Sequence, residues 1–157
     1  MITVINGDLL SSQEDYICHQ ANCMGVMGAG VALQIKKVYP DVYNQYQEYC
    51  YDNCSNTRNM LGTNLIVPIF NHDTGKRQYV VNVFAQFHYG LDGIKTRYDK
   101  FEECMKHLKE TVPTNKTIAM PYFIGCGLAG GDWNIVYDII ERTLGEDYEV
   151  YLYKYKK

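Results

Sequence analysis

The sequence has 157 residues, of which 46% are hydrophobic and 21% are charged, a composition typical of a folded globular chain. The formal net charge is −3 and the lysines and arginines form no basic tract, so we expect no general nucleic-acid binding. No apolar run reaches the ~18 to 20 residues of a membrane span, and no signal peptide opens the chain. We therefore expect one domain over residues 1–157, monomeric and cytoplasmic, with no membrane partner.

The cysteines show no paired C-x-x-C spacing and have no histidine at a zinc-like interval. The six are Cys18, Cys23, Cys50, Cys54, Cys104 and Cys126. Structural zinc sites need two such pairs or equivalent Cys/His spacing. We therefore predict free thiols, no metal site and no cofactor.

The first third of the chain begins with a short β-type run at residues 2–5, which the turn signal Asn6-Gly7-Asp8 closes. A second apolar strand is expected at 16–19, followed by a polar bend at 20–22. A glycine-rich loop with Gly25, Gly28 and Gly30 then leads into a helix from Ala29 to about Lys37, where apolar residues recur with helical spacing.

The middle of the chain resumes after Pro40, which interrupts the first helix. A second helical piece is expected at 42–50 and a surface loop at 52–57. Two strands, 65–70 and 78–85, are separated by a turn and should form a hairpin.

The last third opens with a loop at 88–95 and an amphipathic helix from Thr96 or Arg97 to about Glu110. A buried strand at 117–121 leads into a second glycine-rich loop at 125–131. The remaining expected elements are a helix at 132–144, with Asp132 as a possible N-cap, a strand at 148–153 and a basic tail. This alternation of strands and helices predicts an α/β fold in which a mixed β-sheet has helices on both faces.

Each glycine-rich loop lies between a strand and a helix, and such a loop leaves unpaired backbone N–H groups at the positive end of the helix dipole. That arrangement binds anions, above all phosphate. In open α/β sheets ligands lie beyond the carboxyl ends of the strands, so the two loops could close on a diphosphate from two sides. The match of residues 125–130 to G-x-G-x-x-G is weak, and no P-loop sequence is present.

Several segments together resemble the macrodomain family, in its branch of small ADP-ribose-processing proteins. They are NGDLL at 6–10, HQANCMGVMGAGVALQIKKVYP at 19–40, VNVFAQ at 81–86, TRYDKFEECMKHL at 96–108 and MPYFIGCGLAGGDW at 120–133. The resemblance covers essentially the whole chain. It implies a three-layer α/β/α sandwich with a central mixed β-sheet, and a cleft for ADP-ribose or ADP-ribose 1″-phosphate at the strand ends.

The resemblance also assigns ligand-binding roles. Asp8, flanked by Gly7 and Leu9, matches the residue that accepts the adenine amino group, although a simple turn or helix cap is an alternative. Asn22 matches a residue that contacts the distal ribose. The residues expected around the diphosphate and distal ribose are Gly25, Gly28, Ala29, Gly30 and Val31 from the first loop, and Gly125, Cys126, Gly127, Leu128 and Ala129 from the second.

The resemblance further suggests an enzyme that removes the phosphate of ADP-ribose 1″-phosphate. Relatives that cleave ADP-ribose from protein or DNA carry a lysine near the position of Gln86, and some carry an aspartate at the position of Ala129; neither residue is present here. His19 is then the expected catalytic residue, as a proton donor, a base or a nucleophile, with Asp132 orienting it or a water molecule. A lysine-independent ADP-ribosyl hydrolase and a non-catalytic ADP-ribose reader stay open as alternatives. So do purely structural roles for His19 and for Asp132, the latter as a helix N-cap.

Overall fold

A computed structural model describes residues 1–90 and 93–155. Residues 91–92, which belong to the expected loop at 88–95, and residues 156–157 of the expected basic tail lie outside the described residues. The centre of the fold is a six-stranded sheet in the order β1-β6-β5-β2-β4-β3. Its strands are β1 (Ile2–Asn6), β2 (Tyr16–Ala21), β3 (Asn64–Asn71), β4 (Lys76–Phe84), β5 (Ile118–Pro121) and β6 (Val150–Lys154). Only the β3–β4 hairpin is antiparallel among these pairings, so the sheet is mixed as predicted.

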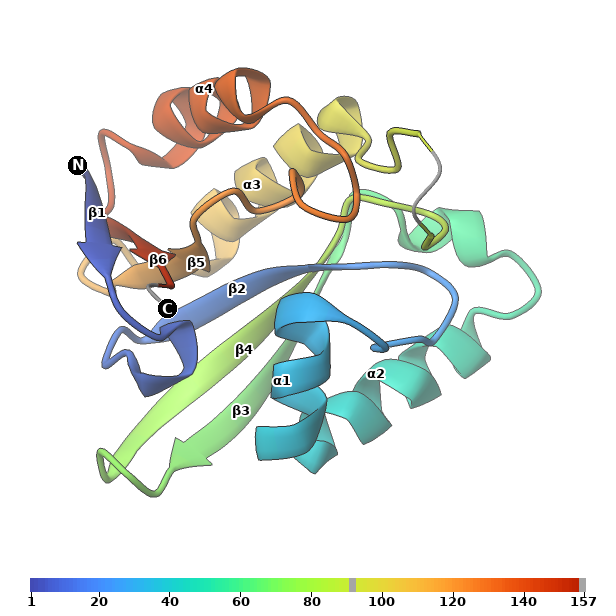
Figure 1. Cartoon of the computed structure of the whole chain (residues 1–157), viewed down its shortest axis with the longest axis horizontal. Helices are drawn as coiled ribbons and strands as arrows, with labels where there is room; N and C mark the ends of the chain where they lie inside the picture. Colours follow the sequence, from blue (N-terminus) through green and yellow to red (C-terminus); the bar gives the residue numbers. More distant parts are fainter. Residues whose placement is uncertain (91–92, 156–157) are drawn as a thin grey trace.

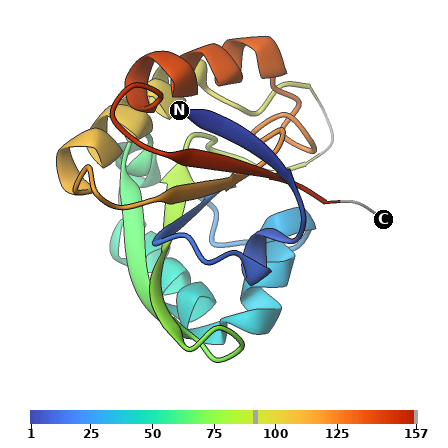
Figure 2. The same cartoon turned by 90° about the vertical axis from the view of Figure 1, so that its left-hand side faces the viewer.

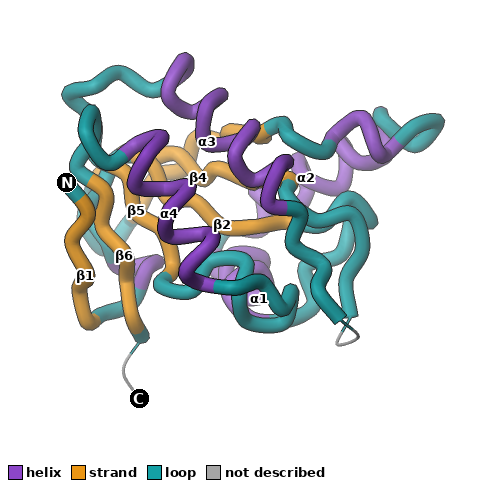
Figure 3. Tube along the Cα trace, turned by 90° about the horizontal axis from the view of Figure 1, so that it is seen from above, coloured by secondary structure: helices purple, strands orange, loops and turns teal. Residues whose placement is uncertain are grey.

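Helices cover both faces of this sheet. They are α1 (Gly30–Val38), α2 (Pro40–Asp52), α3 (Tyr98–Thr111) and α4 (Trp133–Leu144). Figure 1 shows α3 and α4 on one face and α1 and α2 on the other, and the edge-on view in Figure 2 separates the layers. Seen from above, α3 and α4 run across the sheet beside each other (Figure 3). The predicted three-layer α/β/α sandwich is therefore confirmed.

The alternation of side chains along β2 explains how one strand joins two cores. Cys18 points toward α3 and α4 and packs in the cluster that contains Phe101 and Ile140. Ile17 points the opposite way, into the cluster with Ile35 of α1. Successive residues of a strand face opposite sides of the sheet, so a strand buried on both faces is apolar at consecutive positions.

The structure corrects the predicted end of β2. The sequence suggested a bend at 20–22, but Gln20 and Ala21 continue the strand because they pair with Val83 and Phe84 of the longer strand β4. His19 therefore lies inside the strand instead of ending it. A glutamine before Ala-Asn is locally typical of a bend, and only the neighbouring strand extends the ladder.

Two further differences concern short elements. The 3₁₀ helices η1 (Leu9–Ser11) and η2 (Thr57–Met60) were not predicted. Pro40 does separate α1 from α2, and it is also the first residue of α2, where its missing N–H is not needed.

Within residues 1–90 and 93–155, no helix combines the length and the apolar character that a membrane crossing requires.

Strands β2, β4 and β5 are parallel, so their carboxyl ends meet at one edge of the sheet. Three loops leave that edge: the glycine-rich segment before α1, the segment after β4 and the segment after β5. These loops enclose the candidate site.

Candidate functional site

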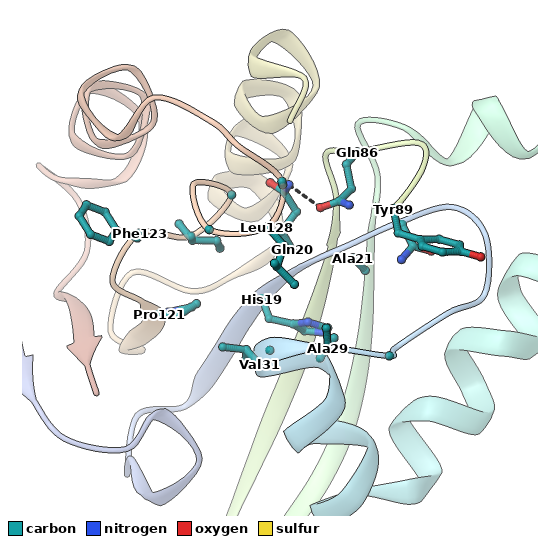
Figure 4. A pocket seen from close by; sticks show the side chains of 18 of the residues that line it. His19, Gln20, Ala21, Ala29, Val31, Gln86, Tyr89, Pro121, Phe123 and Leu128 are labelled. Atoms are coloured by element: carbon teal, nitrogen blue, oxygen red, sulfur yellow. Dashed lines mark hydrogen bonds between the residues drawn. The ribbon is translucent and has the colours of Figure 1, made fainter. Parts of the chain in front are cut away.

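A cavity of about 750 Å³ lies at this edge of the sheet, a volume in the range of small-molecule sites. The predicted residues that line it are His19, Asn22, Gly28, Ala29, Gly30, Val31, Gly125, Gly127, Leu128 and Ala129. Figure 4 shows Phe123 and Pro121 at one end of the cavity and Gln86 and Tyr89 at the other. Among the described residues, no lysine, arginine, aspartate or glutamate lines it.

The start of helix α1 forms one wall. An α-helix leaves the N–H groups of its first turn without partners inside the helix, and the N-cap residue Ala29 has no side-chain group that accepts them. Gly30 has a φ of 60°, which glycine adopts without strain. The helix therefore presents uncapped N–H groups and the positive end of its dipole to the cavity, an arrangement suited to a phosphate.

The second glycine-rich loop forms the opposite wall and is fixed to the segment before α3. The Thr96 hydroxyl donates to the carbonyl oxygen of Gly125 at 2.5 Å, and the Lys95 N–H donates to that of Ala129 at 2.6 Å. Gly125 has a φ of 74°, and a Cβ there would lie 2.8 Å from Gln20 Oε1. The positive φ favours glycine at position 125, and a Cβ there would in addition displace the end of the Gln20 side chain.

His19 lies on the floor of the cavity, beside Ala29 (Figure 4), and is only 1% exposed. Its Nε2 is 2.7 Å from Asn82 Oδ1. The Asn82 Nδ2 group donates to the carbonyl of Leu65, so the atom of Asn82 that faces His19 is the oxygen Oδ1, which accepts. The proton in this bond is therefore on Nε2 of His19. The Nδ1 atom is buried and has no hydrogen-bond partner. His19 is therefore held as the Nε2–H tautomer, with a free lone pair on Nδ1.

Burial lowers the pKa of His19 to about 4, against the opposing effect of the Asn82 hydrogen bond. The imidazole is consequently neutral at pH 7. Asn82 was missed as a site residue, although a lone asparagine in the apolar run VVNVFA is a signal that a buried polar partner exists. His19 and Asn82 are opposite each other in the β2–β4 register.

Asp132 does not take the orienting role that was expected of it. Among the described residues, the hydrogen-bond partner of the His19 ring is Asn82, and the Asp132 carboxylate accepts a hydrogen bond from the N–H of Asn134 at 2.9 Å. The alternative, an N-cap for α4, is what the structure shows. Asp132 also lies outside the lining of the cavity. A catalytic role for Asp132 stays a prediction without geometric support.

Asn22 lines the cavity, but its side chain mainly organises the first loop. Its Oδ1 accepts from the N–H of Met24 at 2.9 Å and lies 2.8 Å from the Tyr46 hydroxyl, while Nδ2 donates to the carbonyl of Val26 at 2.8 Å. Tyr46 is fully buried, and its hydroxyl oxygen also accepts from the N–H of Val26. Helix α2 thereby fixes the loop that precedes α1.

The other predicted residues outside the cavity lining are Gly7, Asp8, Leu9, Gly25 and Cys126. The Asp8 carboxylate caps η1, accepting from the N–H of Leu10 at 3.1 Å and from the Ser11 hydroxyl at 3.4 Å. Leu9 packs in the core beneath α1. Burial raises the pKa of the Cys126 thiol to about 11, so it is protonated at neutral pH.

A second glutamine that the sequence did not single out lies next to Gln86. Gln20 Nε2 donates to Gln86 Oε1 at 2.8 Å (Figure 4) and to Thr96 Oγ1 at 2.9 Å. Gln86 Nε2 in turn donates to the carbonyl of His88. The amide at position 86 is therefore engaged in a fixed network and supplies no nucleophile.

In the described part of the chain, no residue at the Gln86 end of the cavity supplies an amine nucleophile. All six cysteines are free thiols. Within the described residues, no group of three or more His, Cys, Asp or Glu side chains gathers in a metal-binding arrangement.

Comparison with known proteins agrees with this arrangement. The Debaryomyces hansenii protein "ADP-ribose 1''-phosphate phosphatase" is 25% identical, over 97% of this chain and 99% of its own length. A Thermus aquaticus "DNA ADP-ribosyl glycohydrolase" is 30% identical over 98% of this chain, but only 41% of its own length is matched. The solved macrodomain of Thermus aquaticus DarG superposes with a TM-score of 0.75 at 27% identity, covering 98% of this chain and 97% of that one. The Macro domain family profile matches residues 18–140, which is most of the chain and includes both glycine-rich loops. The chain therefore belongs to the Macro domain family.

Proposed function

We propose that this chain binds ADP-ribose in the cavity at the strand ends and hydrolyses ADP-ribose 1″-phosphate to ADP-ribose and phosphate. In this proposal the diphosphate lies between the uncapped start of α1 and the loop at 125–129, which face each other across the cavity. Backbone N–H groups and a helix dipole bind a diphosphate there, and among the described residues no carboxylate lines the cavity and repels it. The full-length similarity to a protein named as the phosphatase supports the same choice.

The observation that carries the catalytic part is the free Nδ1 lone pair of His19. With a pKa of about 4, only about one molecule in a thousand carries an imidazolium at pH 7, so His19 is unsuited to donate a proton to the leaving ribose oxygen. The neutral ring acts as a base that removes a proton from the attacking water, or as a nucleophile. In the second route Nδ1 bonds to phosphorus, the bond to the ribose oxygen breaks and that oxygen takes a proton from solvent, and water then cleaves the phosphoryl-histidine. Because Nδ1 is buried, the atoms that cover it must move slightly for phosphate to reach it.

A paired assay of catalysis and binding tests this function. His19→Ala should abolish phosphate release from ADP-ribose 1″-phosphate, while calorimetry with ADP-ribose should show binding close to that of the unaltered chain. His107→Ala, which alters an exposed histidine of α3, is the control and should leave both properties unchanged. Normal turnover by the His19 variant contradicts the catalytic role.

A second candidate is removal of ADP-ribose from DNA or protein, which the 30% identity to the Thermus aquaticus glycohydrolase favours. Two residues argue against this activity. The Gln86 amide forms no covalent adduct with an opened ribose, and Ala129 supplies no carboxylate. A panel of ADP-ribosylated DNA and protein substrates, run beside the phosphatase assay, separates the two activities. Binding without turnover on every substrate identifies the third possibility, a reader.

We also propose that the protein is monomeric and works in the cytoplasm. Six free thiols in a chain of this size fit a reducing compartment, where disulfides do not persist. Sedimentation analysis and localisation of the tagged protein in its own cells test these two proposals.

A further inference from the structure

The side chain of Gln20 connects three segments of the chain at the edge of the sheet where the cavity lies. Its Nε2 donates to Gln86 Oε1, after β4, and to Thr96 Oγ1, just before α3 (Figure 4). The Thr96 hydroxyl donates to the carbonyl of Gly125 in the second glycine-rich loop, and Gln86 Nε2 donates to the carbonyl of His88. Gln20 belongs to β2, so one amide of a central strand holds the loops after β4 and β5 together.

The direction of each hydrogen bond in this network of Gln20, Gln86 and Thr96 follows from its two ends. Both ends are backbone carbonyl oxygens, which only accept, so Gln86 Nε2 and the Thr96 hydroxyl donate outward. Gln86 Oε1 and Thr96 Oγ1 are then left to accept, and Gln20 turns Nε2 toward both of them. The side chain at position 20 must therefore supply two donors, which glutamine does without adding a charge to the cavity.

The backbone of the second loop packs directly on this network. A Cβ at Gly125 would lie 2.8 Å from Gln20 Oε1 and 3.2 Å from Thr96 Oγ1. The Gly125 carbonyl also accepts from the N–H of Gly131 at 2.9 Å, which closes the loop on itself. Glycine loses more conformational freedom on ordering than any other residue. A loop that lines the cavity with Gly125 and Gly127 is therefore ordered mainly by contacts from outside it, and the Gln20 network supplies them.

We propose that Gln20 is a positioning residue that orders the second glycine-rich loop before the ligand binds. The inference rests on the proposed binding of ADP-ribose, whose diphosphate that loop contacts. When the loop is ordered in advance, the entropy lost in ordering it is not subtracted from the free energy of binding. Gln20 acts through Thr96 and Gly125, whereas the catalytic ring of His19 is held separately by Asn82.

This role affects KM and kcat differently. The diphosphate is not part of the bond that breaks, so a pre-ordered loop stabilises the bound substrate and the transition state alike. Loss of such uniform binding raises KM and leaves kcat unchanged. This pattern is the opposite of that expected for His19, whose loss stops phosphate release and leaves binding intact.

Gln20→Met tests the proposal because it keeps the length of the side chain and removes both donors. Calorimetry should show binding of inorganic pyrophosphate and of ADP-ribose weakened by roughly tenfold, the order expected when one loop residue must be ordered on binding. KM for ADP-ribose 1″-phosphate should rise by a similar factor, with kcat within about twofold of that of the unaltered chain. Amide hydrogen exchange should become faster at Gly130 and Gly131, whose N–H groups donate within the loop.

Gln78→Met is the matched control. Gln78 lies near the start of β4, at the opposite end of that strand from Gln86, and its Nε2 likewise donates to two oxygens, the carbonyls of Ser12 and Glu14. Gln78 is fully buried and does not line the cavity. Gln78→Met should therefore destabilise the chain and leave pyrophosphate affinity and loop exchange unchanged.

Two variants of Thr96 test the same connection with Gln20 unaltered. Thr96→Val removes the hydroxyl between Gln20 and Gly125 and should repeat the effects of Gln20→Met, whereas Thr96→Ser keeps the hydroxyl and should retain binding. The inference is overturned if Gln20→Met and Thr96→Val bind pyrophosphate as tightly as the unaltered chain, or if they lower kcat and leave KM unchanged. Absence of ADP-ribose binding by the unaltered chain, in contrast, refutes the proposed function itself and the inference with it.

Discussion

The pH dependence of folding stability gives a direct test of the environment assigned to His19. Its pKa of about 4 in the folded chain lies below the value of 6.5 for an exposed histidine. Between these values the unfolded chain binds the proton and the folded chain does not. The contribution of His19 to folding stability is therefore fully present above pH 6.5 and is lost as the pH falls toward 4. The difference in pKa is about 2.5, so the complete loss is about 3 kcal/mol, of which about 2.5 kcal/mol falls between pH 7.5 and pH 4.5.

The measurement is urea unfolding at a series of pH values for the unaltered chain and for His19→Gln, followed by the fluorescence of Trp133, the single tryptophan. Other titrating groups affect both proteins alike, so the difference between their unfolding free energies isolates His19. As the pH falls from 7.5 to 4.5, the unfolding free energy of the unaltered chain should fall by about 2 to 3 kcal/mol more than that of His19→Gln. His107→Gln is the control and should follow the unaltered chain. Parallel stability curves for the unaltered chain and His19→Gln would refute the reasoning.

Substitutions at Asn82, Tyr46 and Asp132, with one control at Gln78, test contacts in and near the cavity. Asn82→Leu removes the acceptor that holds Nε2–H of His19, so phosphate release should fall while ADP-ribose affinity persists. Gln78→Leu is the control, because Gln78 is also fully buried in β4. It should destabilise the chain without a selective loss of phosphate release. Tyr46→Phe leaves the partly buried N–H of Val26 and the two oxygens of Asn22 without their hydroxyl partner. Urea unfolding should therefore show a loss of about 1 to 3 kcal/mol, accompanied by weaker ADP-ribose binding. Asp132→Asn keeps the N-cap and should keep both stability and turnover, whereas Asp132→Ala should lose about 1 kcal/mol of stability only; a turnover defect in the asparagine variant would restore Asp132 as a catalytic residue.

The ligand-facing residues differ in how far the sequence could predict them. Gly28, Gly30, Gly125 and Gly127 were predicted because a glycine-rich strand–helix connection has a local meaning, and all four line the cavity. Asp8 was predicted by resemblance alone. Its side chain follows the preference of aspartate for a helix N-cap and bonds to its own neighbours.

The histidine shows where prediction from local pattern ends. The sequence identified His19 as the residue on which catalysis depends, yet left its protonation state and its partner open. The neutral state comes from burial in the fold, and the partner is Asn82, which is 63 residues away and becomes a neighbour only because β2 and β4 pair in parallel. The expected partner, Asp132, lies closer to the second glycine loop in the sequence, but its carboxylate points to its own helix.

The sequence by itself determined the α/β class, the two glycine-rich loops and the helix caps, because each depends on spacing and backbone preference within a few residues. Only the tertiary structure decided which side chains face the cavity, and the tautomer and neutral charge of His19. These properties come from strand register and burial. Such interactions join residues far apart in the chain, and no local pattern specifies them.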